Sequence, residues 1–382
     1  MLRDTLEILR CPCCPSTTLE LSAAFRHDHD EVVEGLLDCP ACGRWYRIEQ
    51  GIPDLVRDAL RETEDERAFL ARHGVQRHPI EVNRTEADQR IVDEGRHWGR
   101  FMARFWDVAD RSIFDLRIKG THPSFFVAGI LEPDDRDTWR PWSMFPARVG
   151  EMCFPWLHQM AGKRGVDVGC GGGQFGLEAA RRGLRIVGFD PSFEEVMLAR
   201  RHAREQGVMT IDYVRGEPAN PPFRDASFDL LMAKDSLHHV PDLEGVMPRL
   251  VATTTPNALL LIHEHVAKAP LKTALMSRLM PRAVAKIRSR WPKSEVPPEL
   301  LRDSANEDVS AHLVRSAIES HATRIHSVES LFLAEELEMV THFAFGKRVW
   351  LTRLVGTLGW WLEQALIAFG DRQHLTWLGR RR

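Results

Sequence analysis

The chain has 382 residues, with 51 Lys and Arg against 54 Asp and Glu, a net charge of -3 and 43% hydrophobic residues. At roughly 150 residues per domain this length predicts two or three domains, and the composition excludes a largely disordered chain and a polytopic membrane protein. A weakly acidic chain does not favour a nucleic-acid partner, because its field repels the phosphate backbone. The sequence opens without an apolar signal core, so we expect a cytoplasmic protein whose cysteines are metal ligands or bystanders rather than disulfides.

A cysteine-rich module occupies residues 1–56. It contains two C-P-x-C turns, at 11–14 and 39–42, with a predicted strand at 32–38 between them. Two such turns present four thiolates to one tetrahedral ion, and zinc fits this ligand set best. We therefore expect a small zinc ribbon whose closed, structural site is formed by Cys11, Cys14, Cys39 and Cys42.

The module also resembles a known family over a longer pattern. Leu-Glu-Ile-Leu at 6–9 precedes the first cysteine pair, and Gly-Arg-Trp-Tyr-Arg-Ile at 43–48 and Gly-Ile-Pro at 51–53 follow the second. This pattern is similar to the small zinc-binding activator subunit of tRNA and release-factor methyltransferases and its short bacterial relatives. The resemblance implies a domain that braces an enzyme within the chain or docks a protein partner.

Residues 57–160 begin as a charged segment and become rich in tryptophan, with Trp98, Trp106, Trp139, Trp142 and Trp156. Apolar residues recur there at helical spacing around 97–108. We expect helices that form a linker and a lid over an acceptor pocket. Whether the tryptophans pack in a core or stabilise a bound sulfonium by cation–π attraction stays open.

Short apolar runs alternate with amphipathic segments in residues 161–264, a pattern typical of βαβ units and a parallel sheet. Ser192 and Glu195 form a capping box, S-x-x-E, which predicts the start of a helix. The predicted helices are 174–182 and 193 to about 206, and the predicted strands are 165–168, 184–189, 209–214, 228–233 and 258–262.

A glycine cluster follows the first of these strands, in the sequence Asp-Val-Gly-Cys-Gly-Gly-Gly at 167–173. Glycines let the backbone turn sharply and let a ligand approach the main chain. A nicotinamide fingerprint, G-x-G-x-x-G, is present at 171, 173 and 176. However, Asp167 beside the loop would repel a pyrophosphate and attract the ammonium of a methionine moiety. Asp190, at the end of the second strand, is placed to accept both hydroxyls of a ribose.

Three further segments complete a resemblance to a large enzyme class. Gly216-Glu217 follows the third strand, the segment 222–229 leads into the fourth, and Ser-Leu-His-His-Val-Pro-Asp at 236–242 follows it. In this order and spacing they closely resemble the class I S-adenosylmethionine-dependent methyltransferases, in particular the branch with quinone-biosynthesis and natural-product enzymes. The resemblance implies an α/β fold, a Rossmann-like sheet of seven strands whose last hairpin is antiparallel, with helical lid insertions.

The same resemblance implies a binding site for S-adenosylmethionine. Glu217 occupies the position at which the family usually has an aspartate that binds the adenine amino group. The next residue of the family usually donates its backbone N–H to the adenine ring, but Pro218 has no N–H. The residues expected to bind the cofactor are Asp167, Gly169, Gly171, Gly173, Asp190, Glu217 and Lys234.

Methyl transfer is an in-line displacement, so a general base matters only if the acceptor must lose a proton. Histidine suits this role near neutral pH, and ligands bind at the carboxyl edge of a parallel sheet. For His239 a structural role is the alternative. The candidates at that edge are Asp235 and His239 after the fourth strand, and His263 and His265 at the end of the fifth.

Residues 265–382 hold a basic segment at 268–293 and an apolar helical stripe at 349–369. Arg353 and Glu363 interrupt the stripe, so a membrane-spanning helix is not expected. We expect this helix between the last two strands, the final strand at 375–378, and a lid insertion in the remainder. The stripe also suits peripheral contact with a membrane or with a lipid-like acceptor.

These features together predict an S-adenosylmethionine-dependent methyltransferase with a structural zinc ion, acting on a small-molecule, lipid-like or peptide acceptor. Two other hypotheses remain. The first is a nicotinamide-dependent oxidoreductase, which Asp167 disfavours. The second is a cofactor-binding scaffold whose ribbon activates a partner methyltransferase.

Overall fold

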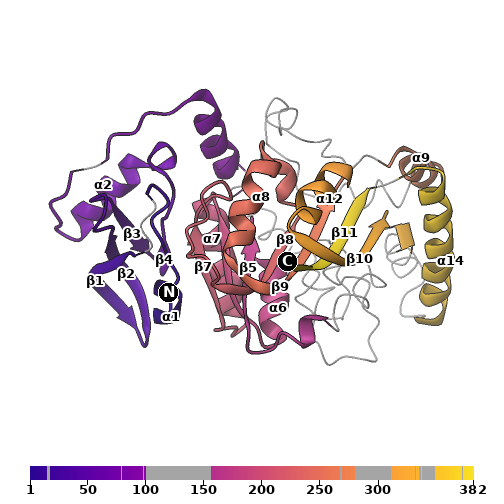
Figure 1. The fold of residues 1–382 in the computed structure, drawn as a ribbon, viewed down its shortest axis with the longest axis horizontal. Coiled ribbons are helices and arrows are strands. Elements are labelled where there is room, and N and C mark those ends of the chain that lie inside the picture. The colour runs from indigo at the N-terminus through magenta and orange to yellow at the C-terminus, as the bar shows by residue number, and fades with distance from the viewer. Residues whose placement is uncertain are drawn as a thin grey trace.

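The protein contains a four-stranded sheet and a seven-stranded sheet, side by side (Figure 1). The smaller sheet lies at one end of the molecule and helix α14 (Val349–Ala368) lies at the other. This computed structural model describes residues 1–14, 18–78, 80–97, 99, 156–266, 269–279, 311–331, 333, 334, 337, 349–371 and 373–382.

The N-terminal module is an antiparallel sheet in the order β1-β2-β3-β4. Its strands pair in sequence order, β1 with β2, β2 with β3 and β3 with β4. Its elements are α1 (Arg3–Leu6), β1 (Glu20–Asp28), β2 (Glu31–Asp38), β3 (Trp45–Glu49) and β4 (Ile52–Pro53), followed by η1 (Asp58–Leu60) and α2 (Thr63–Arg72). The strand predicted between the cysteine pairs is therefore present as β2.

The larger sheet has the order β10-β11-β9-β8-β5-β6-β7, in which β11 runs antiparallel to both of its neighbours. This arrangement confirms the predicted α/β fold class with an antiparallel last hairpin. The first half comprises β5 (Arg164–Val168), α6 (Gln174–Arg181), β6 (Arg185–Asp190), α7 (Phe193–Glu205) and β7 (Ile211–Arg215). The second half comprises β8 (Phe228–Lys234), η3 (Leu237–His239), α8 (Leu243–Ala252), β9 (Thr254–His265), α9 (Pro270–Leu279), α12 (Ala311–Glu319), β10 (Ala322–Ser330), α14 and β11 (His374–Arg381).

Alternate residues of the central strands point to the two faces of this sheet, as the two-residue period of a strand requires. Leu231 and Leu260 pack in one buried cluster with α8 and α12, whereas Leu230 and Leu259 pack in another with α6 and α7. Burial on both faces accounts for the continuous apolar runs of the sequence. Strand β9 is longer than predicted because it pairs along both edges, with β8 and with β11.

The ribbon module is joined to the larger sheet by backbone hydrogen bonds. Leu55 N–H donates to the carbonyl of Arg215 in β7 at 2.8 Å, and Arg10 N–H donates to Pro222 O at 3.0 Å. The apolar core of the ribbon continues into the core on the α8 side of the sheet. These contacts are those expected of an internal brace, and docking of a protein partner by the ribbon stays a prediction.

A buried charge network reinforces this join. The guanidinium of Arg215, only 3% exposed, binds Asp54 at 3.2 Å and Glu62 at 2.9 Å. Arg47 of β3 binds the same Asp54 at 3.2 Å. Asp212 of β7 in turn accepts a hydrogen bond of 2.5 Å from the Thr5 hydroxyl. Removing one partner from such a network leaves an uncompensated buried charge, so the two modules depend on each other.

The capping box predicted at the start of α7 is only half present. Ser192 Oγ accepts a hydrogen bond from Glu195 N–H at 3.3 Å, as predicted. The reciprocal bond from Ser192 N–H goes instead to Asp190 at 2.9 Å. The carboxylate of Asp190 lies closer along the chain and takes this donor, so the side chain of Glu195 turns elsewhere.

In the chain, helix α14 follows β10 and precedes β11, which is the position predicted for the apolar stripe. Glu363, which interrupts that stripe, is fully buried and accepts hydrogen bonds from the backbone N–H groups of Leu331, Leu333 and Ala334. Among the described helices, none combines the length and the apolarity that crossing a bilayer requires. More than half of the segment 57–160 predicted as linker and lid, and most of the basic segment at 268–293, fall outside the described residues, as do Trp98, Trp106, Trp139 and Trp142.

Candidate functional site

The glycine loop connects β5 to α6 at the carboxyl edge of the larger sheet. Gly169, Gly171 and Gly173 have φ values of +62°, +47° and +81°, a region that residues with a Cβ atom rarely adopt. A Cβ atom on Gly169 would lie 2.5 Å from the Cβ atom of Ser236, and one on Gly173 would lie 2.6 Å from the hydroxyl of Tyr213. Conformation and space therefore both require glycine here.

Asp167 lies beneath this loop and is 1% exposed. Its carboxylate accepts a hydrogen bond from Gly176 N–H in the first turn of α6 at 2.8 Å. Burial raises the pKa of Asp167 to about 7, with the nearby Asp190 acting in the same direction. Asp167 thus anchors the loop from below, and its predicted contact with a bound ammonium stays a prediction.

Asp190, at the end of β6, holds the loop from the side. One carboxylate oxygen accepts from Gly171 N–H at 3.1 Å and the other from Ser192 N–H at 2.9 Å. Burial raises the pKa of Asp190, although both hydrogen bonds oppose this shift. Because each carboxylate oxygen has two lone pairs, Asp190 can still accept two ribose hydroxyls. The role of Asp190 in binding a ribose stays a prediction.

Glu195 is a third carboxyl group beside the loop, and the sequence analysis missed it as a site residue. It is 5% exposed, and its Oε2 lies 3.6 Å from the position that a Cβ atom on Gly171 would take. Among the described residues this oxygen has no hydrogen-bond partner. Burial, and next the charge of Asp190, raises the pKa of Glu195 to about 8. A carboxyl group with this pKa is mostly neutral at pH 7, so the negative charge that disfavours a pyrophosphate comes from Asp167 and Asp190.

Glu217, expected at the adenine end, is 4% exposed and already has a partner. Its carboxylate lies 2.9 Å from Nε of Arg57, which also binds Asp88 at 2.6 Å. Arg57 comes from the segment that follows the ribbon, so the ribbon side of the molecule contacts the predicted adenine site. The role of Glu217 in binding adenine stays a prediction.

Lys234 and Asp235 end β8 at the same edge. The ammonium of Lys234 contacts Asp235 Oδ2 at 2.6 Å, and Asp235 N–H donates to the carbonyl of His263 at 2.8 Å. Although partial burial opposes ionisation, the charge of Lys234 holds the pKa of Asp235 well below its usual range. This carboxylate is therefore ionised at neutral pH.

The two histidines after β8 have different surroundings. His238 Nδ1 lies 2.9 Å from Glu264, whose other oxygen accepts from Ser236 N–H and Leu237 N–H. Although burial opposes it, this bond raises the pKa of His238. His239 is exposed and lies 3.4 Å from Glu94. Neither contact reaches the glycine loop, and a catalytic role for His239 stays a prediction.

The two histidines predicted on β9 also differ. His263 is fully buried, and its Nδ1 lies 2.7 Å from the hydroxyl of Thr376 in β11. Burial lowers the pKa of His263 to about 4, so its ring is neutral at physiological pH. His265 is half-buried, and burial lowers its pKa as well. Because His265 is the more accessible of the two, it is the better placed to meet an acceptor.

His374, at the start of β11, completes this group and was missed by the sequence analysis. Its ring stacks on that of His263 with 5.2 Å between the centroids, and it meets His265 edge to face at 5.2 Å. Burial lowers the pKa of His374 below its usual value. No local motif marks this residue, because only the pairing of β11 with β9 brings it to the edge.

The four predicted zinc ligands converge in the ribbon. Their Sγ atoms all lie within 4.8 Å of one another, with Cys11 to Cys42 at 3.7 Å and Cys14 to Cys39 at 3.5 Å. Zn–S bonds of about 2.3 Å in a tetrahedron place sulfur atoms roughly 3.8 Å apart. The four thiols therefore fit a zinc ion. Cys13, outside this set, lies 3.6 Å from Asp58.

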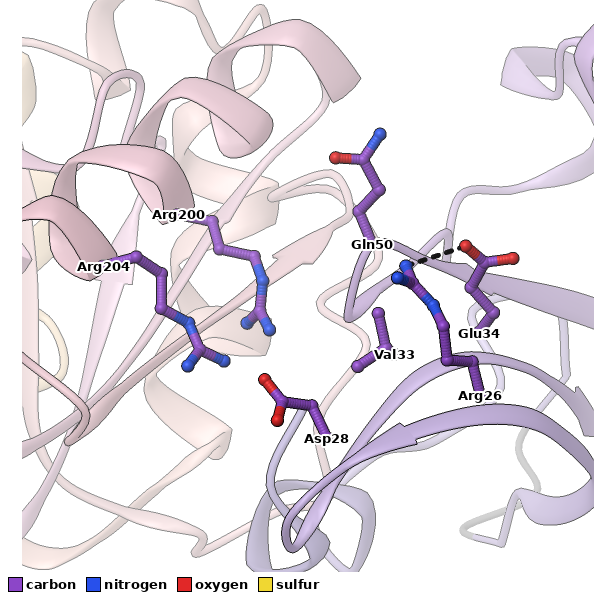
Figure 2. A pocket seen from close by; sticks show the side chains of 7 residues that line it. All are labelled: Arg26, Asp28, Val33, Glu34, Gln50, Arg200 and Arg204. Carbon is purple, nitrogen blue, oxygen red and sulfur yellow. Dashed lines mark hydrogen bonds and ion pairs between the residues drawn. The ribbon is translucent and has the colours of Figure 1, made fainter.

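A cavity of about 430 Å³ lies between the ribbon and α7, away from the glycine loop (Figure 2). Its cationic side chains have acidic partners: Arg26 binds Glu34 at 2.9 Å, and Arg200 and Arg204 bind Glu31. This charge balance indicates a contact seam between the two modules. The lining residues are Arg26, Asp28, Val33, Glu34, Gln50, Arg200 and Arg204.

Two family models match the chain. Residues 166–262 match the methyltransferase domain, and residues 3–51 match the Trm112p-like protein family. The first match includes the glycine loop and the ends of β5, β6, β7 and β8 but stops before His263, and the second includes all four clustered cysteines. The chain therefore contains a methyltransferase domain and a Trm112p-like domain, which confirms both resemblances found in the sequence.

Curated relatives also match part of the chain. The ubiquinone biosynthesis O-methyltransferase of Azorhizobium caulinodans is 30% identical over 150 residues, which cover 38% of this chain and 57% of the relative. The enzyme of the same name from Rhodopseudomonas palustris strain BisB18 is 28% identical over 241 residues, or 60% of this chain and 85% of the relative. The chain thus spans between about half and most of the length of these relatives.

Among solved structures, phosphoethanolamine N-methyltransferase 2 of Haemonchus contortus in complex with S-adenosyl-L-methionine is 16% identical to this chain, with a TM-score of 0.43. The alignment covers 72% of this chain and 59% of that protein.

Proposed function

We propose that this chain, which joins a Trm112p-like ribbon to a methyltransferase domain, transfers a methyl group from S-adenosylmethionine to a small lipid-like acceptor. The main observation behind the proposal is the loop of three glycines with positive φ, which hydrogen bonds to the carboxylates of Asp167 and Asp190 hold in place. S-adenosylmethionine, when bound, supplies an electrophilic methyl group on a sulfonium cation. The ionised forms of Asp167 and Asp190 would favour that cation electrostatically, whereas Glu195, with a pKa of about 8, is mostly neutral at pH 7.

The residues at the ends of β8 and β9 would serve the acceptor. A side chain there must orient the acceptor and, if a hydroxyl reacts, hold its proton. His265 is half-buried and fits this task better than His263, which is fully buried and whose pKa is about 4. Asp235 is ionised and would orient the acceptor or the imidazolium that forms.

A lipid-like hydroxyl compound is the acceptor class that we propose. The printed names of the relatives point to O-methylation in ubiquinone biosynthesis. Helix α14 supplies an independent observation, because its outer side carries apolar side chains at helical spacing. They have exposed fractions of 38–68%: Trp350, Leu354, Leu358, Trp361 and Leu362. Phe369, directly after the helix, is 82% exposed. Such a stripe suits peripheral contact with a bilayer that holds the acceptor.

The ribbon would act within the chain. We propose that Cys11, Cys14, Cys39 and Cys42 hold a structural zinc ion and that the ribbon stabilises the adenine end of the site through Arg57. An activator of a separate methyltransferase would need a free docking surface, but this ribbon already contacts the β7 side of its own larger sheet. This contact favours the enzyme over the scaffold hypothesis.

Two measurements test the proposal. Calorimetry should detect binding of S-adenosylmethionine and S-adenosylhomocysteine, and no binding of NADH. Labelled methyl groups from S-adenosylmethionine should then appear on a phenol with a polyprenyl tail, rather than on small amines or peptides. Binding of NADH in place of S-adenosylmethionine would refute the cofactor, and labelling of amines alone would refute the acceptor class.

A further inference from the structure

Three side chains of metal-ligand type converge at the carboxyl edge of the larger sheet, outside the ribbon. Asp235 follows β8, His263 lies near the end of β9, and His374 begins β11. One ligand atom of each lies within 4.8 Å of the other two. His238, close by in the sequence, is held by Glu264 instead.

Neighbouring groups hold this arrangement in place. Asp235 N–H donates to the carbonyl of His263, and the hydroxyl of Thr376 contacts His263 Nδ1 at 2.7 Å. Metal-binding histidines usually have one ring nitrogen held by such a second group, which leaves the other nitrogen as the ligand. The rings of His263 and His374 are stacked with 11° between their planes, so one ring has to tilt before both can direct a nitrogen lone pair at a common ion.

Asp235 gives a second, independent observation. Its φ of +48° is unusual for a residue with a Cβ atom, and such conformations are typical of functional sites. One carboxylate oxygen binds Lys234, but the other is buried without a hydrogen-bond partner among the described residues. Buried polar atoms are nearly always paired in folded proteins, so this oxygen is a candidate metal ligand. The side chain as a whole is 33% exposed, so an ion there would keep an open coordination position.

We propose that Asp235, His263 and His374 bind a divalent first-row transition-metal ion. Two imidazoles and one carboxylate are a ligand set that such ions accept. Bonds of about 2.1 Å place the ligand atoms roughly 3.0–3.4 Å apart, so from separations of up to 4.8 Å the side chains need to close by no more than about 2 Å. The ion would bind an acceptor oxygen and favour loss of its proton to His265. This last role rests on the proposed methyltransferase function, whereas metal binding does not.

The experiment starts from the full chain with its ribbon loaded with zinc. Equilibrium dialysis against Co²⁺, followed by elemental analysis, should find about one Co²⁺ per chain in addition to the zinc. The visible spectrum should show weak bands without the intense thiolate-to-cobalt absorption that exchange in the ribbon would produce. The double variant His263→Ala/His374→Ala should lose the Co²⁺ and keep the zinc. The control His326→Ala, at an exposed position in β10, should keep both ions.

Two single variants keep the test decisive if the double variant fails to fold. Asp235→Asn should weaken Co²⁺ binding at least tenfold, and Lys234→Met should strengthen it, because the competing ammonium is removed. The proposal is overturned if the wild type binds no Co²⁺ beyond the ribbon metal, or if Asp235→Asn binds Co²⁺ like the wild type. Co²⁺ binding without methyl transfer to any acceptor would uphold the site and count against the proposed function.

Discussion

The pH dependence of stability tests the carboxyl group that the sequence analysis missed. Burial raises the pKa of Glu195 from 4.5 to about 8, so the folded protein retains a proton that the unfolded chain releases. The stability from this group is fully present below pH 4.5 and is lost as the pH rises through about 8. A shift of this size corresponds to about 5 kcal/mol in all, of which about 4 kcal/mol falls between pH 5 and pH 9.

The perturbation is Glu195→Gln, which keeps the shape and stays neutral at every pH. Urea unfolding of wild type and variant at pH 5, 7 and 9, at constant zinc, gives the difference in unfolding free energy. Between pH 5 and pH 9 the unfolding free energy of the variant, taken relative to that of the wild type, should rise by about 4 kcal/mol. Glu205→Gln is the matched control, because Glu205 lies on the same helix with its side chain 59% exposed. If the Glu195→Gln difference does not change with pH, the group is not buried as a neutral acid.

Three further predictions concern the two modules. The purified chain should carry about one thiolate-bound zinc, and Cys39→Ser should release it, as elemental analysis after gel filtration would show; a full zinc content in the variant would exclude this ligand. Asp190→Ala should weaken S-adenosylmethionine binding at least about tenfold in calorimetry, because charge-assisted hydrogen bonds to the ribose are lost; undiminished affinity would contradict the ribose assignment. Arg215→Met should lower the unfolding free energy by about 3–5 kcal/mol in urea, since it leaves Asp54 and Glu62 unpaired; a loss below about 1 kcal/mol would mean that the brace contributes little.

The parts of the molecule that the sequence predicted are those with a local signal. The strands around Val168 and Phe189 are apolar runs bounded by glycine and acid, and the two cysteine pairs have the spacing of a metal knuckle. Chain order and strand-end position then place Asp167 and Asp190 at one edge of the sheet. Each of these inferences needs only neighbouring residues and the geometry of a parallel sheet.

The parts that sequence reasoning missed depend on contacts between distant segments. Arg57 meets Glu217 across 160 residues of chain, and His374 reaches His263 only because β11 inserts beside β9. Glu195 is a different case, because its local motif has an ordinary explanation as a helix cap. Only the structure shows that Asp190 takes the bond that Glu195 would have made, which leaves the Glu195 side chain beside the glycine loop.

The contact between Leu55 and Arg215 has a further consequence, for aggregation. β7 is the last strand of its sheet, and an uncovered last strand offers free N–H and C=O groups to other chains. Here the segment after β4 runs parallel to β7, and its Leu55 N–H donates a hydrogen bond to the carbonyl of Arg215. The ribbon precedes β7 in the chain, so during synthesis this cover is made before the strand that it protects. A version that lacks the ribbon would leave both the strand and its buried arginine open, and such molecules would pair with one another through their β7 strands.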